Sequence, residues 1–116
     1  MSAPALIAVV TTVASAAEAE AIATALVESR LAACVQVEAI DSVYRWQGRV
    51  ERAAEHRVVA KALRERYEAI AAAIRARHSH ELPAIWSVAV DRADPAYARW
   101  VAVESAAAGV ADVSGS

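Results

Sequence analysis

The sequence of 116 residues has no phenylalanine, three glycines and one cysteine. The single cysteine, Cys34, excludes a framework of intrachain disulfides and any metal cage built from several thiolates of one chain. We therefore expect a reduced, cytoplasmic protein. Three glycines leave no room for a glycine-rich phosphate loop, and neither a G-x-S-x-G elbow nor an H-E-x-x-H motif occurs. These absences predict a protein that is not an enzyme and requires no cofactor.

Long hydrophobic runs and blocks of like charge are also missing. No stretch of about 18 residues is apolar enough to suggest a membrane span. Residues 3–10 are apolar and precede a small-residue segment, Ala14-Ser15-Ala16, but a secretory signal also needs a basic leader, and the first basic residue is Arg30. The net charge is −2, with acids and bases interspersed. Neither a membrane nor a nucleic acid is therefore an expected partner.

The residues that are present suit one small globular domain. Hydrophobic residues make up 58 % and charged residues 22 % of the chain. The chain contains 32 alanines, so the bulk of the core must come from Leu, Ile, Val, Trp and Tyr. The length fits a single domain, which we place at residues 1–105. Residues 106–116 are rich in Ala, Gly and Ser, and we expect a flexible tail there.

Hydrophobic periodicity predicts four strands and three helices. Alternating or continuous apolar runs predict strands at 5–13, 33–46, 49–63 and 85–90. Spacings of three and four predict helices at about 16–30, at 64–77 and after Asp94-Pro95. Ser15 and Glu18 have the spacing of a capping box. The alternation slips at residues 40–42, where we expect a bulge or bend.

This order, β-α-β-β-α-β, predicts an α+β fold of the ferredoxin-like (split βαβ) type, with a long central hairpin and an extra C-terminal helix. A strand of fourteen residues spans roughly 46 Å, at about 3.3 Å per residue. A helix of fifteen residues covers only about 23 Å. The hairpin therefore extends past the helices, and its far end carries apolar and aromatic side chains at Val43, Tyr44, Trp46 and Val50. Self-association through this end is expected.

Several residue runs resemble the CutA divalent-cation tolerance family in order and spacing, over about residues 5–103. The matching positions are Thr12, Arg30-Leu31-Ala32-Ala33-Cys34, Ser42-Val43-Tyr44-Arg45-Trp46-Gln47-Gly48, Glu55, Lys61, His78, Glu81-Leu82-Pro83, Tyr97 and Trp100. The resemblance implies a ferredoxin-like protomer in a tight homotrimer, a stable soluble protein, and a link to tolerance of copper and other divalent cations. It also implies likeness to PII-type signalling trimers, and no catalytic activity is attached to the family.

The chain departs from the family's pattern at five positions. The family's His-Pro-Tyr-Glu segment is His78-Ser79-His80-Glu81 here, so one histidine is added. Ala84 stands where a glutamate commonly follows the proline, Thr11 where some members have a cysteine, and Ala62 where a threonine is usual. These changes remove candidate metal ligands.

Four side chains remain as candidate metal ligands: His78, His80, Glu81 and Cys34. Imidazole suits divalent copper, nickel and zinc, and a thiolate suits copper. Each also has a structural interpretation. Histidines at the end of a helix interact with its last carbonyl groups, and a lone cysteine in a strand is most often a core residue. The metal would be Cu(II) or another divalent cation.

Four further residues have two interpretations each. Tyr44 and Trp46 could stack on a ligand, although subunit contact is the preferred role for aromatic residues there. Glu55 and Lys61 could hold a small anion, although an ion pair between them is preferred. Two functions therefore stay open. One is a homotrimer that binds divalent metal; the other is a metal-independent trimeric sensor or scaffold that binds a small ligand or an unidentified protein in its subunit clefts.

Overall fold

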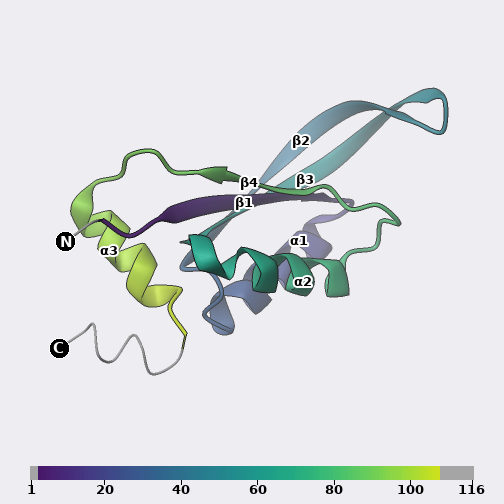
Figure 1. The fold of residues 1–116 in the computed structure, drawn as a ribbon. Coiled ribbons are helices and arrows are strands. Elements are labelled where there is room, and N and C mark those ends of the chain that lie inside the picture. Colours follow the sequence, from purple (N-terminus) through teal and green to yellow (C-terminus); the bar gives the residue numbers. More distant parts are fainter. Residues whose placement is uncertain (1–2, 108–116) are drawn as a thin grey trace.

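A four-stranded antiparallel sheet runs through the molecule and carries three helices (Figure 1). The computed structural model describes residues 3–107. Its elements are β1 (Leu6–Val13), α1 (Ala16–Glu28), β2 (Cys34–Trp46), β3 (Arg49–Leu63), a 3₁₀ turn (Arg64–Arg66), α2 (Tyr67–Arg77), β4 (Ile85–Ala89) and α3 (Pro95–Glu104). The strand order β2-β3-β1-β4, with every pair antiparallel, confirms the ferredoxin-like prediction. No helix between residues 3 and 107 is long and apolar enough to cross a bilayer.

Helices α1 and α3 begin where the predicted capping residues lie. The Ser15 side chain accepts a hydrogen bond of 3.1 Å from the Glu18 N–H and starts α1. Asp94 Oδ2 accepts from the N–H groups of Ala96 and Tyr97, at 3.2 Å each, and Pro95 occupies the first turn of α3. Proline suits this position because the first N–H groups of a helix have no partner within it.

Two hydrophobic clusters lie on opposite faces of the sheet. The main core joins α1 and α2 to β1 and β3, with Ile22, Leu26, Ile70 and Ile74 packed on Val9, Val13 and Val58. A smaller cluster of Leu6, Ala98 and Val101 fastens α3 to the other face at one end of the sheet. The rest of that second face is not covered by a helix, as Figure 1 shows.

The hairpin of β2 and β3 is continuous and extends beyond the helices. Its pairing runs without interruption from Cys34 opposite Lys61 to Trp46 opposite Arg49. This continuous register excludes the bulge that was one of the two features predicted at residues 40–42, and the other, a bend, stays a prediction. The hydrophobic alternation changes there because the strands pass beyond the helical layer, and not because the register shifts. The molecule measures 54 Å along its longest axis and 25 and 21 Å along the others.

The segment predicted as a tail lies mostly outside the described residues. Residues 108–116 are not described. Of the two that are, Ala106 is buried and Ala107 is exposed. The Ser105 hydroxyl just before them accepts a hydrogen bond of 3.0 Å from the Leu63 N–H. The chain is therefore held against the end of β3 up to this point.

The turn at the tip of the hairpin has two residues with positive φ, Gln47 at 50° and Gly48 at 79°. This matches the two-residue turns that fit the twist of a β-hairpin. We expect Gly48→Ala to lower the free energy of unfolding by about 1 kcal/mol, because an L-residue is strained at positive φ. A Cβ at Gly48 would meet no atom within 4 Å, so steric contact adds nothing. Urea unfolding at fixed protein concentration measures the change.

The neighbouring change Gln47→Asn serves as the control. Asparagine tolerates the left-handed region better than glutamine does, so this variant should unfold at an equal or higher urea concentration. If Gly48→Ala and Gln47→Asn lowered the free energy of unfolding equally, the explanation from positive φ would be contradicted.

Candidate functional site

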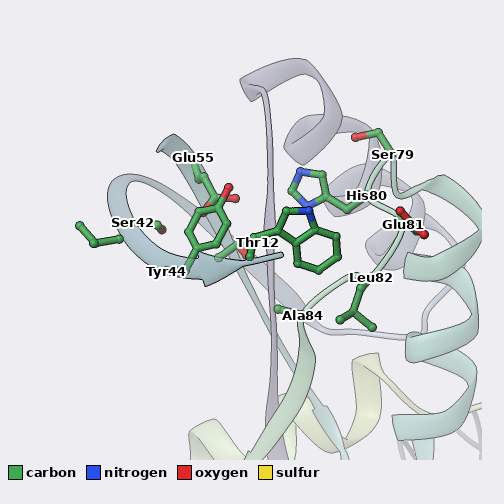
Figure 2. A pocket seen from close by; sticks show the side chains of 11 residues that line it. Thr12, Ser42, Tyr44, Glu55, Ser79, His80, Glu81, Leu82 and Ala84 are labelled. Carbon is green, nitrogen blue, oxygen red and sulfur yellow. The ribbon is translucent and has the colours of Figure 1, made fainter. Parts of the chain in front are cut away.

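A cavity of about 700 Å³ lies between the hairpin and the connection from α2 to β4 (Figure 2). The hairpin contributes Ser42, Val43, Tyr44 and Trp46 from β2 and Glu55 from β3. The connection contributes Ser79, His80, Glu81, Leu82 and Ala84, and β1 contributes Thr12. The cavity therefore brings together residues that are up to 72 positions apart in the sequence.

The connection is anchored by the N-terminal turn of α1. The Glu18 carboxylate accepts hydrogen bonds from the Ser79 N–H at 2.8 Å and from the Ser79 hydroxyl at 3.1 Å. The sequence predicted that this carboxylate would complete a capping box with Ser15. The Ser15 half of the box is present, while Glu18 bonds instead to a segment 61 residues away. Tertiary contact thus replaces a local bond.

The His78 side chain is buried under the same connection. Its side chain is 1 % exposed. Its Nε2 lies 2.8 Å from the Thr12 carbonyl oxygen, and its Nδ1 lies 3.1 Å from the His80 backbone nitrogen. A carbonyl can only accept, so Nε2 carries the proton and Nδ1 accepts from the His80 N–H. Both ring nitrogens of His78 are engaged, and in this arrangement neither can bind a metal.

The Glu18 carboxyl has a pKa below its usual value of 4.5. Burial alone would raise this pKa, since it penalises the charged form. The hydrogen bonds from Ser79, the positive charge of His78 when protonated, and the Ala14 N–H lower it and prevail. The carboxylate therefore stabilises the fold above pH 4.5, and this contribution disappears as the pH falls through the lowered pKa of the folded state.

A Glu18→Gln variant tests this anchor. We expect the wild type to exceed the variant in free energy of unfolding by more at pH 7 than at pH 3, because the charged form is the stabilising one. Urea titrations at the two pH values give the comparison. An equal difference at both pH values would contradict a role for the charge.

Cys34 lies apart from the other candidate ligands. It begins β2, at one edge of the sheet, whereas the connection that carries His80 and Glu81 leads into β4 at the other edge. Between residues 3 and 107, no three His, Cys, Asp or Glu side chains come close enough to hold a metal ion. Within one protomer, the cavity thus combines only His80 and Glu81 from the predicted ligand set.

The preferred ion pair between Glu55 and Lys61 is wrong. Six positions along one extended strand separate them by about 20 Å. The Lys61 ammonium instead lies 5.9 Å from the centre of the Tyr97 ring, and Glu55 faces the cavity. The cross-strand pair that does form joins Arg57 to Glu38 at 3.5 Å. The sequence did not predict that Glu55 lines a cavity. Polar residues occupy much of this part of β3, so Glu55 does not stand out from its neighbours.

Comparison with known proteins gives a consistent family assignment. The family model described as "CutA1 divalent ion tolerance protein" matches residues 7–104. A divalent-cation tolerance protein CutA from Archaeoglobus fulgidus is 33 % identical over 84 residues, which cover 72 % of this chain and 82 % of that protein. The chain also matches the mouse and Xenopus CutA proteins, and spans about half of their length, 48 % and 54 %.

Solved structures agree with the sequence comparison. CutA from Synechococcus elongatus superposes with a TM-score of 0.85 at 31 % identity, covering 91 % of this chain and 95 % of that one. A structure described as the periplasmic divalent cation tolerance protein CutA from Archaeoglobus fulgidus gives 0.81 at 31 % identity, covering 83 % and 94 %. With the family model matching most of the chain, these likenesses show that the protein belongs to the CutA1 divalent ion tolerance family.

Proposed function

We propose that the chain is the subunit of a homotrimer that provides tolerance to divalent cations, copper among them, by binding the metal directly. The observation that supports assembly is the large apolar surface left uncovered in one protomer. At the hairpin, Val43 is 58 % and Val50 is 61 % exposed. On the sheet face opposite α1 and α2, Trp86 and Val88 are also exposed. Exposed apolar surface of this extent is typical of subunit interfaces.

The proposed metal ligands are His80 and Glu81. Both are exposed at the cavity wall, and the His80 ring nitrogens have no hydrogen-bond partner among residues 3–107. Two ligands make an incomplete site, so a further ligand must come from a neighbouring subunit or from water. Cys34 remains a candidate only as a ligand supplied by a neighbouring subunit. We assign His78 a structural role because both of its nitrogens are engaged.

Calorimetric titration with Cu(II) tests direct binding. We expect binding by the wild type, and its loss in the double variant His80→Ala, Glu81→Ala. Affinity should fall as the pH drops below about 6.5, because protonated imidazole does not bind metal. The control is Glu68→Ala, which removes an exposed carboxylate on α2, away from the cavity. Unchanged stoichiometry and affinity in the double variant would refute this ligand assignment.

The second candidate function is a metal-independent trimeric sensor that binds a small ligand or a partner protein. The size of the cavity favours this alternative, because 700 Å³ is ample for a small organic molecule. A wild-type protein that binds no divalent metal in the titration would select it over the first. Both candidates are binding roles without catalysis.

The proposed location is the cytoplasm. A single cysteine, which the structure leaves unpaired, suits a reducing compartment. The Archaeoglobus structure is described as periplasmic, so fractionation of cells that express the full-length protein is the appropriate test.

A further inference from the structure

Arg30 has a backbone conformation that normally requires glycine. Its φ is 61°, which lies in the left-handed region. Arg30 follows the end of α1, where its N–H donates to the Val27 carbonyl at 3.0 Å. The next N–H, that of Leu31, donates to the Leu26 carbonyl at 3.0 Å. These two bonds form the Schellman motif, in which glycine is the usual residue because a Cβ is strained at positive φ. An arginine at this position is therefore unfavourable unless its side chain makes stabilising contacts.

The Arg30 side chain connects the end of α1 to the end of α3. Its Nη2 donates a hydrogen bond of 2.8 Å to the Val103 carbonyl, and its Nη1 lies 3.7 Å from the Glu104 Oε1. Both partners lie in the last turn of α3, where carbonyl groups have no partner within the helix and carry partial negative charge. The hydrogen bond is the stronger contact, because the ion pair joins two exposed side chains. The guanidinium thus compensates for the strained backbone by holding a second helix.

Helix α3 is attached to the sheet by less apolar surface than α1 and α2 are. Its buried residues are Ala98 and Val101, whereas α1 and α2 bury isoleucine and leucine side chains. Figure 1 shows α3 at the end of the sheet opposite the hairpin tip. Five exposed residues, 90–94, connect it to β4. Because burial stabilises in proportion to apolar area, the polar contacts of Arg30 and Ser105 provide much of its attachment.

We propose that Arg30 is a latch that holds α3 closed on the sheet, and that α3 opens as a unit while the main core stays folded. Elements with little buried apolar surface open more often than the core does. Opening separates the guanidinium from the Val103 carbonyl and uncovers the side chains of Leu6 and Leu63. The open state therefore presents apolar surface that the closed state hides. This motion requires neither the proposed metal site nor the proposed trimer.

Hydrogen exchange of the full-length protein at pH 7, followed by mass spectrometry, measures the opening. We expect the amides of α3 to exchange at least roughly tenfold faster than those of β1 and α1, after correction for intrinsic exchange rates. The reason is that α3 can open locally, whereas the main core exchanges only when larger parts of the protein unfold. Equal protection of α3 and the main core would overturn the proposal.

The variant Arg30→Gly separates the latch from the backbone conformation. Glycine relieves the strain at positive φ, so β1 and α1 should be protected from exchange at least as well as in the wild type. Without the guanidinium, α3 should exchange roughly tenfold faster than in the wild type. General destabilisation would accelerate exchange everywhere, so opposite effects on α1 and α3 identify the latch. Unchanged or slower exchange of α3 in this variant would overturn the proposal.

The matched control is Arg77→Ala. Arg77 Nη1 also donates to a helix carbonyl, that of Ala73 at 3.2 Å, but this bond lies within α2 and joins no second element. The control should therefore leave the exchange of α3 at the wild-type rate. If Arg77→Ala accelerated the exchange of α3 as much as Arg30→Gly does, the latch would be refuted. Light scattering on the same samples reports the oligomeric state, so failure of the proposed trimer would be seen separately from the behaviour of α3.

Discussion

The double variant Val43→Glu, Val50→Glu is expected to remain monomeric. Both valines lie on the same face of the hairpin, beyond the end of the helical layer, where a protomer leaves them more than half exposed. A charge at such a position costs the isolated protomer little. In an apolar interface, however, an unpaired buried carboxylate opposes association strongly. Light scattering should give about 37 kDa for the wild type, three times the 12.2 kDa chain, and about 12 kDa for the variant.

The control is the same change at a valine on another element. Val27 on α1 is 42 % exposed and lies outside the hairpin, so Val27→Glu should keep the wild-type mass. Far-ultraviolet circular dichroism of each variant shows whether the protomer is folded. A stable wild-type mass near 12 kDa would refute the trimer itself. A wild-type mass in the hairpin variant would show that this end of the hairpin is not an interface.

The change His78→Ala is expected to lower the free energy of unfolding by about 2–4 kcal/mol. It empties a site where the side chain is 1 % exposed and leaves the Thr12 carbonyl and the His80 N–H without their partners. The effect should appear in urea unfolding at fixed protein concentration, because folding and assembly would be linked in the proposed trimer.

His80→Ala is the matched control, two residues away. The His80 side chain is exposed, so this variant should stay within about 0.5 kcal/mol of the wild type. The two variants therefore test the proposed division of roles, with His78 needed for stability and His80 for metal binding. Equal loss of stability in the two variants would contradict the division.

Most of the fold could be predicted from local sequence patterns. The apolar run of β1, the stripe of α1 at intervals of three and four, and the Asp94-Pro95 start of α3 each depend on residues close together in sequence. Such signals gave the order of elements and hence the topology. The slip in hydrophobic alternation at residues 40–42 does not mark a bulge. Burial changes there for a reason outside the strand, because the helices that cover one face of the sheet come to an end.

The candidate site was only partly predictable, because its contacts are long-range. Glu18 and Ser79 are 61 residues apart, and nothing near Glu18 distinguishes a capping glutamate from one that binds a distant loop. The two histidines at 78 and 80 have identical side chains, and only tertiary burial assigns them different roles. The sequence could not place Glu55 in a cavity, because that cavity is formed by segments distant in the sequence. An ion pair with Lys61 was predicted instead.

Strand β2 is an edge of the sheet along its full 13 residues. Its outer row of backbone N–H and C=O groups is a template on which another extended chain can add as a strand. An isolated protomer therefore carries a risk of aggregation at this edge. Charged side chains interrupt the strand at Glu38, Asp41 and Arg45, and such charges disfavour pairing with the wrong chain. In this strand the charged positions thus oppose pairing with a wrong chain, while the exposed apolar positions are the ones assigned to the proposed subunit interface.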